Sequence, residues 1–172
     1  NIDTHARDNW FPVNAILNSK TLTEGAGQVR AISRLAFDTA LRAGKMEQLH
    51  EAIQDLYKLE EGQGEQALRV IIVSSLAGGT GSGLILPVAL YIKNYLATHF
   101  RQSANITRGF FILPEVFDEV IPGQVERNTL RSNAYATLRE LDAFLMKGDK
   151  TLPDSYQDTV KIDFPRVGSA GY

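Results

Sequence analysis

The sequence contains no cysteine, which excludes disulfide bonds, thiolate metal ligands and cysteine nucleophiles. It also lacks an excess of basic residues. The formal net charge is -2 and the pI about 5.9, so no positive field favours nucleic acid or an anionic membrane. The longest purely apolar run, residues 84–92, is far shorter than the roughly 20 residues of a membrane span. We therefore expect a cytoplasmic protein without a nucleic-acid or membrane partner.

Two further kinds of site are missing. The three histidines, His5, His50 and His99, are far apart and lack the spacing of metal ligands. We therefore predict no metal site built by the protein itself, and we expect His50, within an amphipathic helix, at the surface. No Gly-x-Ser-x-Gly nucleophile elbow occurs either. The sequence thus identifies no catalytic residue.

The composition is that of an ordinary globular domain. Hydrophobic residues make up 44% of the 172 residues, which is enough for a substantial core. No repeat and no linker divides the chain, so we treat residues 1–172 as a single domain. Because the chain starts at Asn1 without a methionine, we expect this domain to be part of a longer protein.

Hydrophobic periodicity predicts alternating helices and strands. Residues 23–44 and 45–61 have helical spacing. The first helix is expected to be entered through the glycine loop Gly25-Ala26-Gly27 and to be stopped by Gly44. The continuous aliphatic run 69–76 indicates a strand buried on both faces. Residues 83–100 indicate a mostly apolar helix with Pro87 in or just after its first turn.

The second half of the chain continues this alternation. Residues 106–113 indicate a strand, 114–128 a loop, 129–148 an amphipathic helix with Leu130, Ala134 and Leu138 on its apolar side, and 158–164 a half-exposed strand. This order predicts parallel strands joined by right-handed crossovers. The predicted fold class is α/β, a three-layer sandwich with a mostly parallel sheet.

The most specific stretch is "AGGTGSG", which follows the first strand and opens a helix. Ligands of open α/β sheets bind beyond the carboxyl ends of the strands. A helix N-terminus presents free N–H groups and about half a positive charge, and glycine lets the main chain close around phosphate oxygens. We therefore predict a phosphate-binding loop made of Ala77, Gly78, Gly79, Thr80, Gly81, Ser82 and Gly83.

Two common phosphate-binding fingerprints do not fit this loop. A P-loop has a lysine directly after its last glycine, but Leu84 follows Gly83 and the next lysine is Lys93. The dinucleotide fingerprint Gly-x-Gly-x-x-Gly, begun at Gly79, would place its third glycine on Leu84.

At all seven places the loop resembles the signature of the tubulin and FtsZ superfamily, (Ala/Gly/Ser)-Gly-Gly-Thr-Gly-(Ser/Ala)-Gly. The resemblance implies a Rossmann-like GTPase domain, present here in part, in which this loop wraps the phosphates of GTP or GDP, with Mg²⁺ as the accompanying ion. The "NAYATLREL" helix and Trp10-Phe11-Pro12 look more like the divergent bacterial tubulin-like proteins than like tubulin or FtsZ proper.

Two other stretches extend the resemblance. "TEGAGQVRAISRLAF" is similar to the segment that the family places near the γ-phosphate, which implies Gly25, Ala26 and Gly27 as further phosphate contacts. A plain helix-entry turn is the alternative. "ERNTLRSNAYATLREL" is similar to the approach to the next helix, which implies Glu126 and Arg131 as ribose-binding residues, with Asn133 nearby; a helix cap or a solvated charge is the other reading.

The resemblance implies a GTP-binding cytoskeletal protein that polymerises head to tail with copies of itself. Family members hydrolyse GTP with an acidic loop that the neighbouring subunit inserts, so GTPase activity is expected only in the assembled full-length protein. Two alternatives stay open. One is a degenerate tubulin-like scaffold without hydrolysis, and the other is an α/β enzyme that acts on a phosphorylated substrate.

Overall fold

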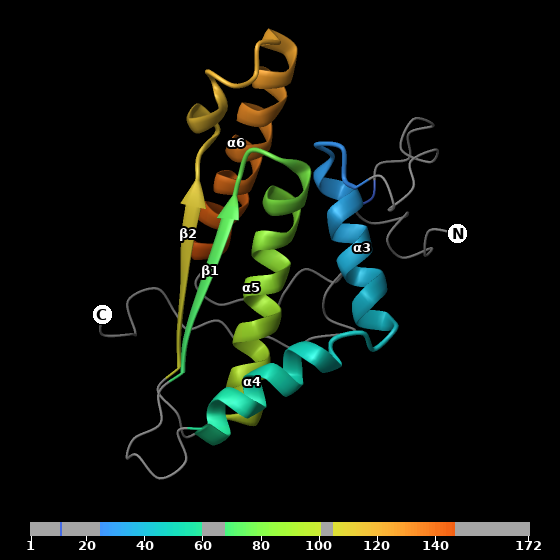
Figure 1. Ribbon diagram of the computed structural model, residues 1–172, viewed down its shortest axis with the longest axis vertical. Helices are drawn as coiled ribbons and strands as arrows, with labels where there is room; N and C mark the ends of the chain where they lie inside the picture. The colour runs from blue at the N-terminus through green and yellow to red at the C-terminus, as the bar shows by residue number, and fades with distance from the viewer. Residues whose placement is uncertain (1–10, 12–24, 60–67, 101–104, 147–172) are drawn as a thin grey trace.

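A computed structural model describes residues 11, 25–59, 68–100 and 105–146. Within them two strands and four α-helices form a mixed α/β structure (Figure 1). The elements in chain order are α3 (Arg30–Arg42), α4 (Glu47–Leu59), β1 (Arg69–Ser75), α5 (Gly79–His99), β2 (Ile106–Ile112), the 3-10 helix η2 (Pro114–Phe117) and α6 (Gln124–Met146).

The two strands confirm the predicted parallel pairing. β1 and β2 run side by side in parallel, with Arg69 opposite Ile106 and Ser75 opposite Ile112, and α5 makes the crossover between them. The third predicted strand, residues 158–164, lies outside the described residues. A three-layer sandwich therefore stays a prediction, whereas the α/β class and the parallel sheet are findings.

The prediction that the first strand is buried on both faces is wrong for the described structure. Val70 and Ile72 of β1 pack toward α5. Ile71 and Val73, which alternate with them, are 60% and 66% exposed, and Phe110 opposite Val73 is 59% exposed. Successive strand side chains point to opposite faces, so the aliphatic run buries only one of its two rows within the described residues.

The apolar helix α5 is the centre of the described structure. It packs against β1, α3 and α6, and its Ile85, Leu90 and Leu96 are buried. It begins at Gly79, four residues earlier than predicted, so Pro87 lies inside the helix rather than near its first turn. Among the described residues, no helix combines the length and the apolar character that crossing a membrane requires.

The boundaries of the first helix agree with the sequence, whereas one other predicted boundary needs correction. Helix α3 begins at Arg30, after the glycine loop through which its entry was predicted, and Gly44, with φ of +67°, follows its end as predicted. The loop predicted for residues 114–128 contains η2 and the first turn of α6. The first helical bond runs from the Arg127 N–H to the Gly123 carbonyl (3.1 Å), and the Arg127 guanidinium adds a bond to the Ile121 carbonyl before the helix (2.9 Å).

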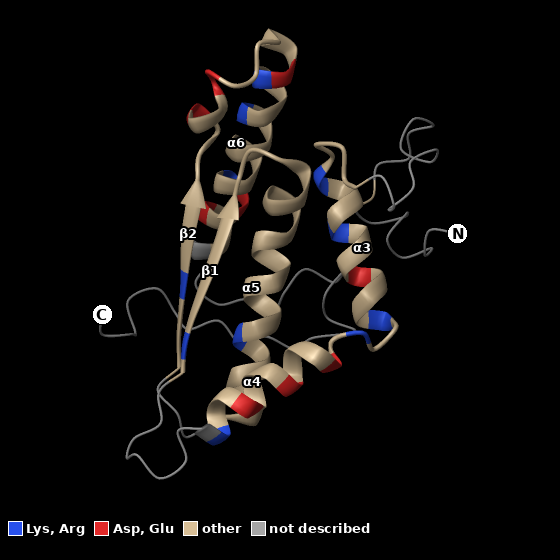
Figure 2. Ribbon diagram, in the orientation of Figure 1, with Lys and Arg blue, Asp and Glu red and all other residues tan. Residues whose placement is uncertain are grey.

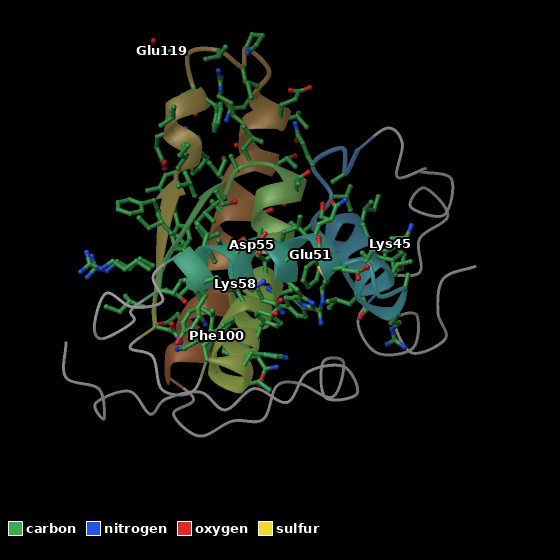
Figure 3. All side chains as sticks on the ribbon, turned by 60° about the horizontal axis from the view of Figure 1, so that its bottom comes forward. Lys45, Glu51, Asp55, Lys58, Phe100 and Glu119 are labelled. Carbon is green, nitrogen blue, oxygen red and sulfur yellow. The ribbon has the colours of Figure 1, made fainter. Side chains whose placement is uncertain are left out.

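Helix α4 covers the far end of α5 through stacked rings. His50 is half-buried, contrary to the expectation of a surface residue: its ring stacks on Tyr95 (centroids 4.2 Å apart) and its Nε2 lies 2.5 Å from the Tyr91 hydroxyl. Burial raises the pKa of Tyr91. The other side of α4 is solvated, and its exposed Glu51, Asp55 and Lys58 lie along the helix in Figure 3.

Lys93 supplies a prediction about stability. Burial in α5 lowers the pKa of its ammonium group below the ordinary value of 10.5. The unfolded chain therefore holds this proton more tightly, and the free energy of unfolding should rise as the pH climbs through the folded pKa toward 10.5. We expect Lys93→Met to remove this rise and to leave the fold at least as stable as the wild type at pH 7.

Urea denaturation at pH 7 and pH 10 measures both effects. Lys58→Met is the matched control, because the Lys58 side chain is 68% exposed. An equal pH slope in wild type and Lys93→Met would contradict the prediction.

Candidate functional site

One end of the described structure gathers the parts of the candidate site. Both strands point toward this end, and α3, α5 and α6 all begin there (Figure 1). The N-termini of α3 and α5 therefore direct partial positive charge toward the edge where parallel α/β sheets bind ligands, whereas α6 begins farther out, beyond η2 (Figure 1). Figure 2 shows acidic and basic positions mixed at this end, around η2 and the start of α6. The main-chain polarity of this end suits an anion.

The N-terminus of α5 carries the free main-chain donors. Its N-cap, Gly78, is extended (φ -81°, ψ 167°), and no side chain caps the helix. The first bond into the helix runs from the Ser82 N–H to the Gly78 carbonyl (3.3 Å). The N–H groups of residues 79–81 accordingly have no acceptor within the helix.

The predicted loop of residues 77–83 is shorter in the structure, because α5 already begins at Gly79. Ala77 is buried (2% exposed), and its N–H bonds the Ser75 hydroxyl (3.2 Å). Of the predicted loop, only Ala77 and Gly78 precede the helix, and residues 79–83 already belong to the start of α5. The donors for a ligand come from a helix N-terminus rather than from an open loop.

Two of the signature glycines lie against the chain that enters α3. A Cβ atom on Gly79 would come within 2.5 Å of the Val29 nitrogen and 2.6 Å of the Gln28 carbonyl carbon. A Cβ on Gly83 would overlap the carbonyl oxygen of Arg30. Main chain cannot move aside as a flexible side chain can, so both positions require glycine for packing alone.

The other two signature glycines differ from each other. A Cβ on Gly81 would overlap the carbonyl oxygen of Ser75 at the end of β1. Gly78, in contrast, has nothing within 4 Å of its Cβ position, and its φ suits any residue. Gly78 is therefore the one glycine of the signature for which the described residues give no packing reason.

The two hydroxyl groups of the signature also have different surroundings. Thr80 is exposed at the second position of α5. Ser82 is 2% exposed and its hydroxyl donates to the Gly78 carbonyl. Thr80 thus stays available to a ligand, while the Ser82 hydroxyl is engaged inside the helix.

The first glycine turn, residues 25–28, lies beside this helix N-terminus. Gly25, Gly27 and Gln28 have φ of +75°, +51° and +64°, a region that glycine tolerates and that costs other residues energy. The Ala26 carbonyl accepts the Val29 N–H (2.8 Å), and α3 begins without a side-chain cap. The turn therefore delivers a second uncapped helix N-terminus to the same end.

A cavity of about 350 Å³ opens between the two segments. Gly25 and Ala26 from the first turn and Thr80 from α5 line it, together with apolar side chains that include Ile32, Phe37 and Leu84. The structure thus brings these three predicted phosphate-binding residues to one cavity. Most of its lining is apolar, and the hydroxyl groups among its lining side chains are those of Thr80 and Ser33.

A buried polar row on α6 joins the two segments. The Asn133 Nδ2 amino group donates to the Gln28 carbonyl and to the Ala77 carbonyl, each at 3.0 Å. One turn later the Thr137 hydroxyl is 3.2 Å from the Ser82 carbonyl. Asn133 and Thr137 are 8% and 0% exposed. Both side chains face the glycine segments. The apolar pattern of the helix did not predict that this side of α6 is packed.

The apolar side predicted for this helix is only partly correct. Leu130 and Ala134 are buried, but Leu138 is 44% exposed. The signal for the polar row was the pair Asn133 and Thr137 at i, i+4 in an otherwise ordinary helix. Hydrophobic periodicity does not detect such a row, because its residues count as solvent-facing.

Arg30 is tied to the same packing. Its guanidinium donates to the Ser82 carbonyl (3.3 and 3.2 Å) and pairs with Glu140 of α6 (2.5 Å). Its charge therefore links α3, α5 and α6. Within the described structure Arg30 acts as a bridge between elements.

The predicted ribose residues lie on α6. Glu126 is in its first turn, and its carboxylate lies over the Gly123 backbone. Arg131 pairs with Asp118 after η2 (2.6 Å). In the described part of the chain, neither residue forms a hydrogen bond or ion pair with a glycine segment. Among these residues, no group of three or more histidine, aspartate or glutamate side chains could hold a metal ion.

Comparison with known families gives a match over nearly the whole chain. A family model described as "Tubulin like" matches residues 3–170, nearly the whole chain. No curated protein and no solved structure matches the sequence.

Proposed function

This chain belongs to the tubulin-like family, and on that premise we propose that it binds GTP with the phosphates at the N-terminus of α5. The observation that carries the proposal is the uncapped helix start, where the N–H groups of residues 79–81 have no acceptor within the helix. Free first-turn amides and the helix dipole attract phosphate. The exposed Thr80 hydroxyl adds a donor, and the open space at Gly78 admits an oxygen next to the main chain.

The first glycine turn would meet the outer end of the same polyphosphate. Gly25 and Ala26 share a cavity with Thr80, so a chain of phosphates that starts at α5 can extend toward residues 25–27. Glu126 and Arg131 would hold the ribose. Mg²⁺ would come with the nucleotide, because this ion is usually bound through substrate phosphates and water.

Assembly and hydrolysis complete the proposal. Copies of the protein would polymerise head to tail, and each contact would bring a catalytic group of the neighbouring subunit to the bound GTP. Turnover would then depend on assembly. The family membership of the chain supports this part.

Equilibrium binding to the full-length protein tests the first part. We expect GTP to bind at micromolar concentration and GDP to bind more weakly. Because the proposed contacts are made to the phosphates, guanosine should hardly bind and tripolyphosphate should compete with GTP. Sedimentation with GTP, GDP and no nucleotide tests assembly. Guanosine binding as tightly as GTP, or no binding of GTP, would overturn the proposal.

A second function, a tubulin-like scaffold without hydrolysis, is favoured by a specific observation. Contacts with the protein's own main chain explain why residues 79, 81 and 83 are glycines. A scaffold that needs these glycines only for packing would therefore carry the same signature as a nucleotide-binding protein. The sedimentation experiment separates the two functions. Assembly that is indifferent to nucleotide supports the scaffold.

A further inference from the structure

Asn133 is the one described side chain that bonds to both glycine segments. Its amino group donates one hydrogen bond to the Gln28 carbonyl, beside the first turn, and one to the Ala77 carbonyl, before α5. The residue is 8% exposed. Both N–H bonds of one amide group are thus used to hold two segments that lie 49 positions apart in the sequence (77 - 28).

The bond to Gln28 holds a strained residue. Gln28 is the one described non-glycine residue with a positive φ, +64°, a conformation that costs a side-chain-bearing residue of order 1 kcal/mol or more. Such a residue keeps this conformation only where its surroundings fix it. Asn133, bonded to its carbonyl, and Gly79, packed against its backbone, are those surroundings.

Other contacts join α5 to its neighbours without reaching residues 25–28. Thr137 of α6 and Arg30 of α3 both lie against the Ser82 carbonyl, and Gly83 packs against the Arg30 backbone. In the described structure, the first turn itself is held by the bond of the Asn133 amide to Gln28 and by the packing of Gly79 against the Gln28 backbone.

We propose that Asn133 is a positioning residue that sets the separation of the two glycine segments and thereby the preference of the site for a triphosphate over a diphosphate. This inference rests on the proposed function. A polyphosphate that reaches both segments needs them at a fixed distance, whereas a shorter one is satisfied by the N-terminus of α5 alone. Loss of the Asn133 bonds should therefore weaken GTP binding more than GDP binding.

Asn133→Asp tests the inference with almost no change of size. It replaces the two donors by a carboxylate that faces two carbonyl oxygens, so the segments should move apart. We expect the affinity of the full-length protein for GTP to fall tenfold or more and that for GDP by less than threefold. The readout is the ratio of the two affinities, because a merely structural defect lowers the active fraction for both nucleotides equally.

Thr137→Val is the matched control on the same buried face. It removes a hydroxyl that lies within hydrogen-bond distance of the Ser82 carbonyl and of the Asn133 main-chain carbonyl, but it leaves both bonds of the Asn133 side-chain amide in place. Stability should therefore fall while the ratio of the two affinities stays at the wild-type value. If Asn133→Asp does not fold, Asn133→Ser replaces it, because its single short donor reaches at most one carbonyl. An unchanged ratio in the folded variant overturns the inference. Wild-type protein that binds no guanine nucleotide overturns the proposed function instead, and this inference with it.

Discussion

Gly81→Ala is expected to destabilise the fold by about 2 kcal/mol, although alanine is the better helix former. Helix propensity alone would favour alanine by about 1 kcal/mol. The new Cβ, however, would overlap the carbonyl oxygen of Ser75 and lie 2.5 Å from the Ser74 hydroxyl oxygen. Overpacking of this kind typically costs 1–3 kcal/mol, and more where rigid main chain must move. The clash exceeds the propensity gain, so the net sign is destabilising.

Gly78→Ala is the matched control within the same signature. Its Cβ would meet nothing within 4 Å, and its φ of -81° suits alanine. Only the weaker N-cap preference of alanine acts against it, which costs about 1 kcal/mol or less. Chemical denaturation of both variants in the absence of nucleotide measures the difference.

The pair also separates packing from ligand binding. If Gly78 is glycine because a phosphate oxygen approaches it, Gly78→Ala should lose no more than about 1 kcal/mol of stability and still lose affinity for GTP. Equal stability of Gly81→Ala and wild type would show that the end of β1 is not held against α5 as described.

The sequence predicted the helices and strands more reliably than it predicted which of their side chains are buried. The continuous run of β1 and the apolar α5 fixed a β-α-β unit, because their length and period have few alternatives. The same run suggested burial on both faces, yet Ile71 and Val73 are exposed. A hydrophobic pattern shows which residues can be buried, whereas the residues that cover them are set by tertiary structure.

The candidate site was predictable where chemistry is local to the sequence. The signature glycines could be named from the sequence pattern and the first turn from the family resemblance, whereas the start of α5 was predicted four residues too late. The hydrogen bonds of the Asn133 side chain could not be predicted, because their two acceptors, the carbonyls of Gln28 and Ala77, are distant in sequence. The early start of α6 was missed for a local reason, because the turn signal at Pro122-Gly123 favoured a loop over the residues that form the first turn of the helix.

Thr80→Glu should abolish GTP binding while it leaves the fold as stable as the wild type or more so. Thr80 is exposed in the first turn of α5, which contains no acidic residue. A carboxylate there interacts favourably with the helix dipole, by about 0.3–1 kcal/mol. It also accepts hydrogen bonds from the amides that would hold phosphate, and its charge repels the nucleotide. We expect the affinity for GTP to fall at least 100-fold.

Thr80→Gln has nearly the same size without the charge, so it should keep GTP affinity within about tenfold of wild type. Isothermal titration with GTP and thermal denaturation without it give the two measurements on each variant. Misfolding cannot explain lost binding in a variant whose melting temperature has not fallen. Because the carboxylate would occupy the N-terminus of α5, wild-type affinity in Thr80→Glu would mean that the phosphates bind elsewhere. In that case the free amides of residues 79–81 would have no part in nucleotide binding.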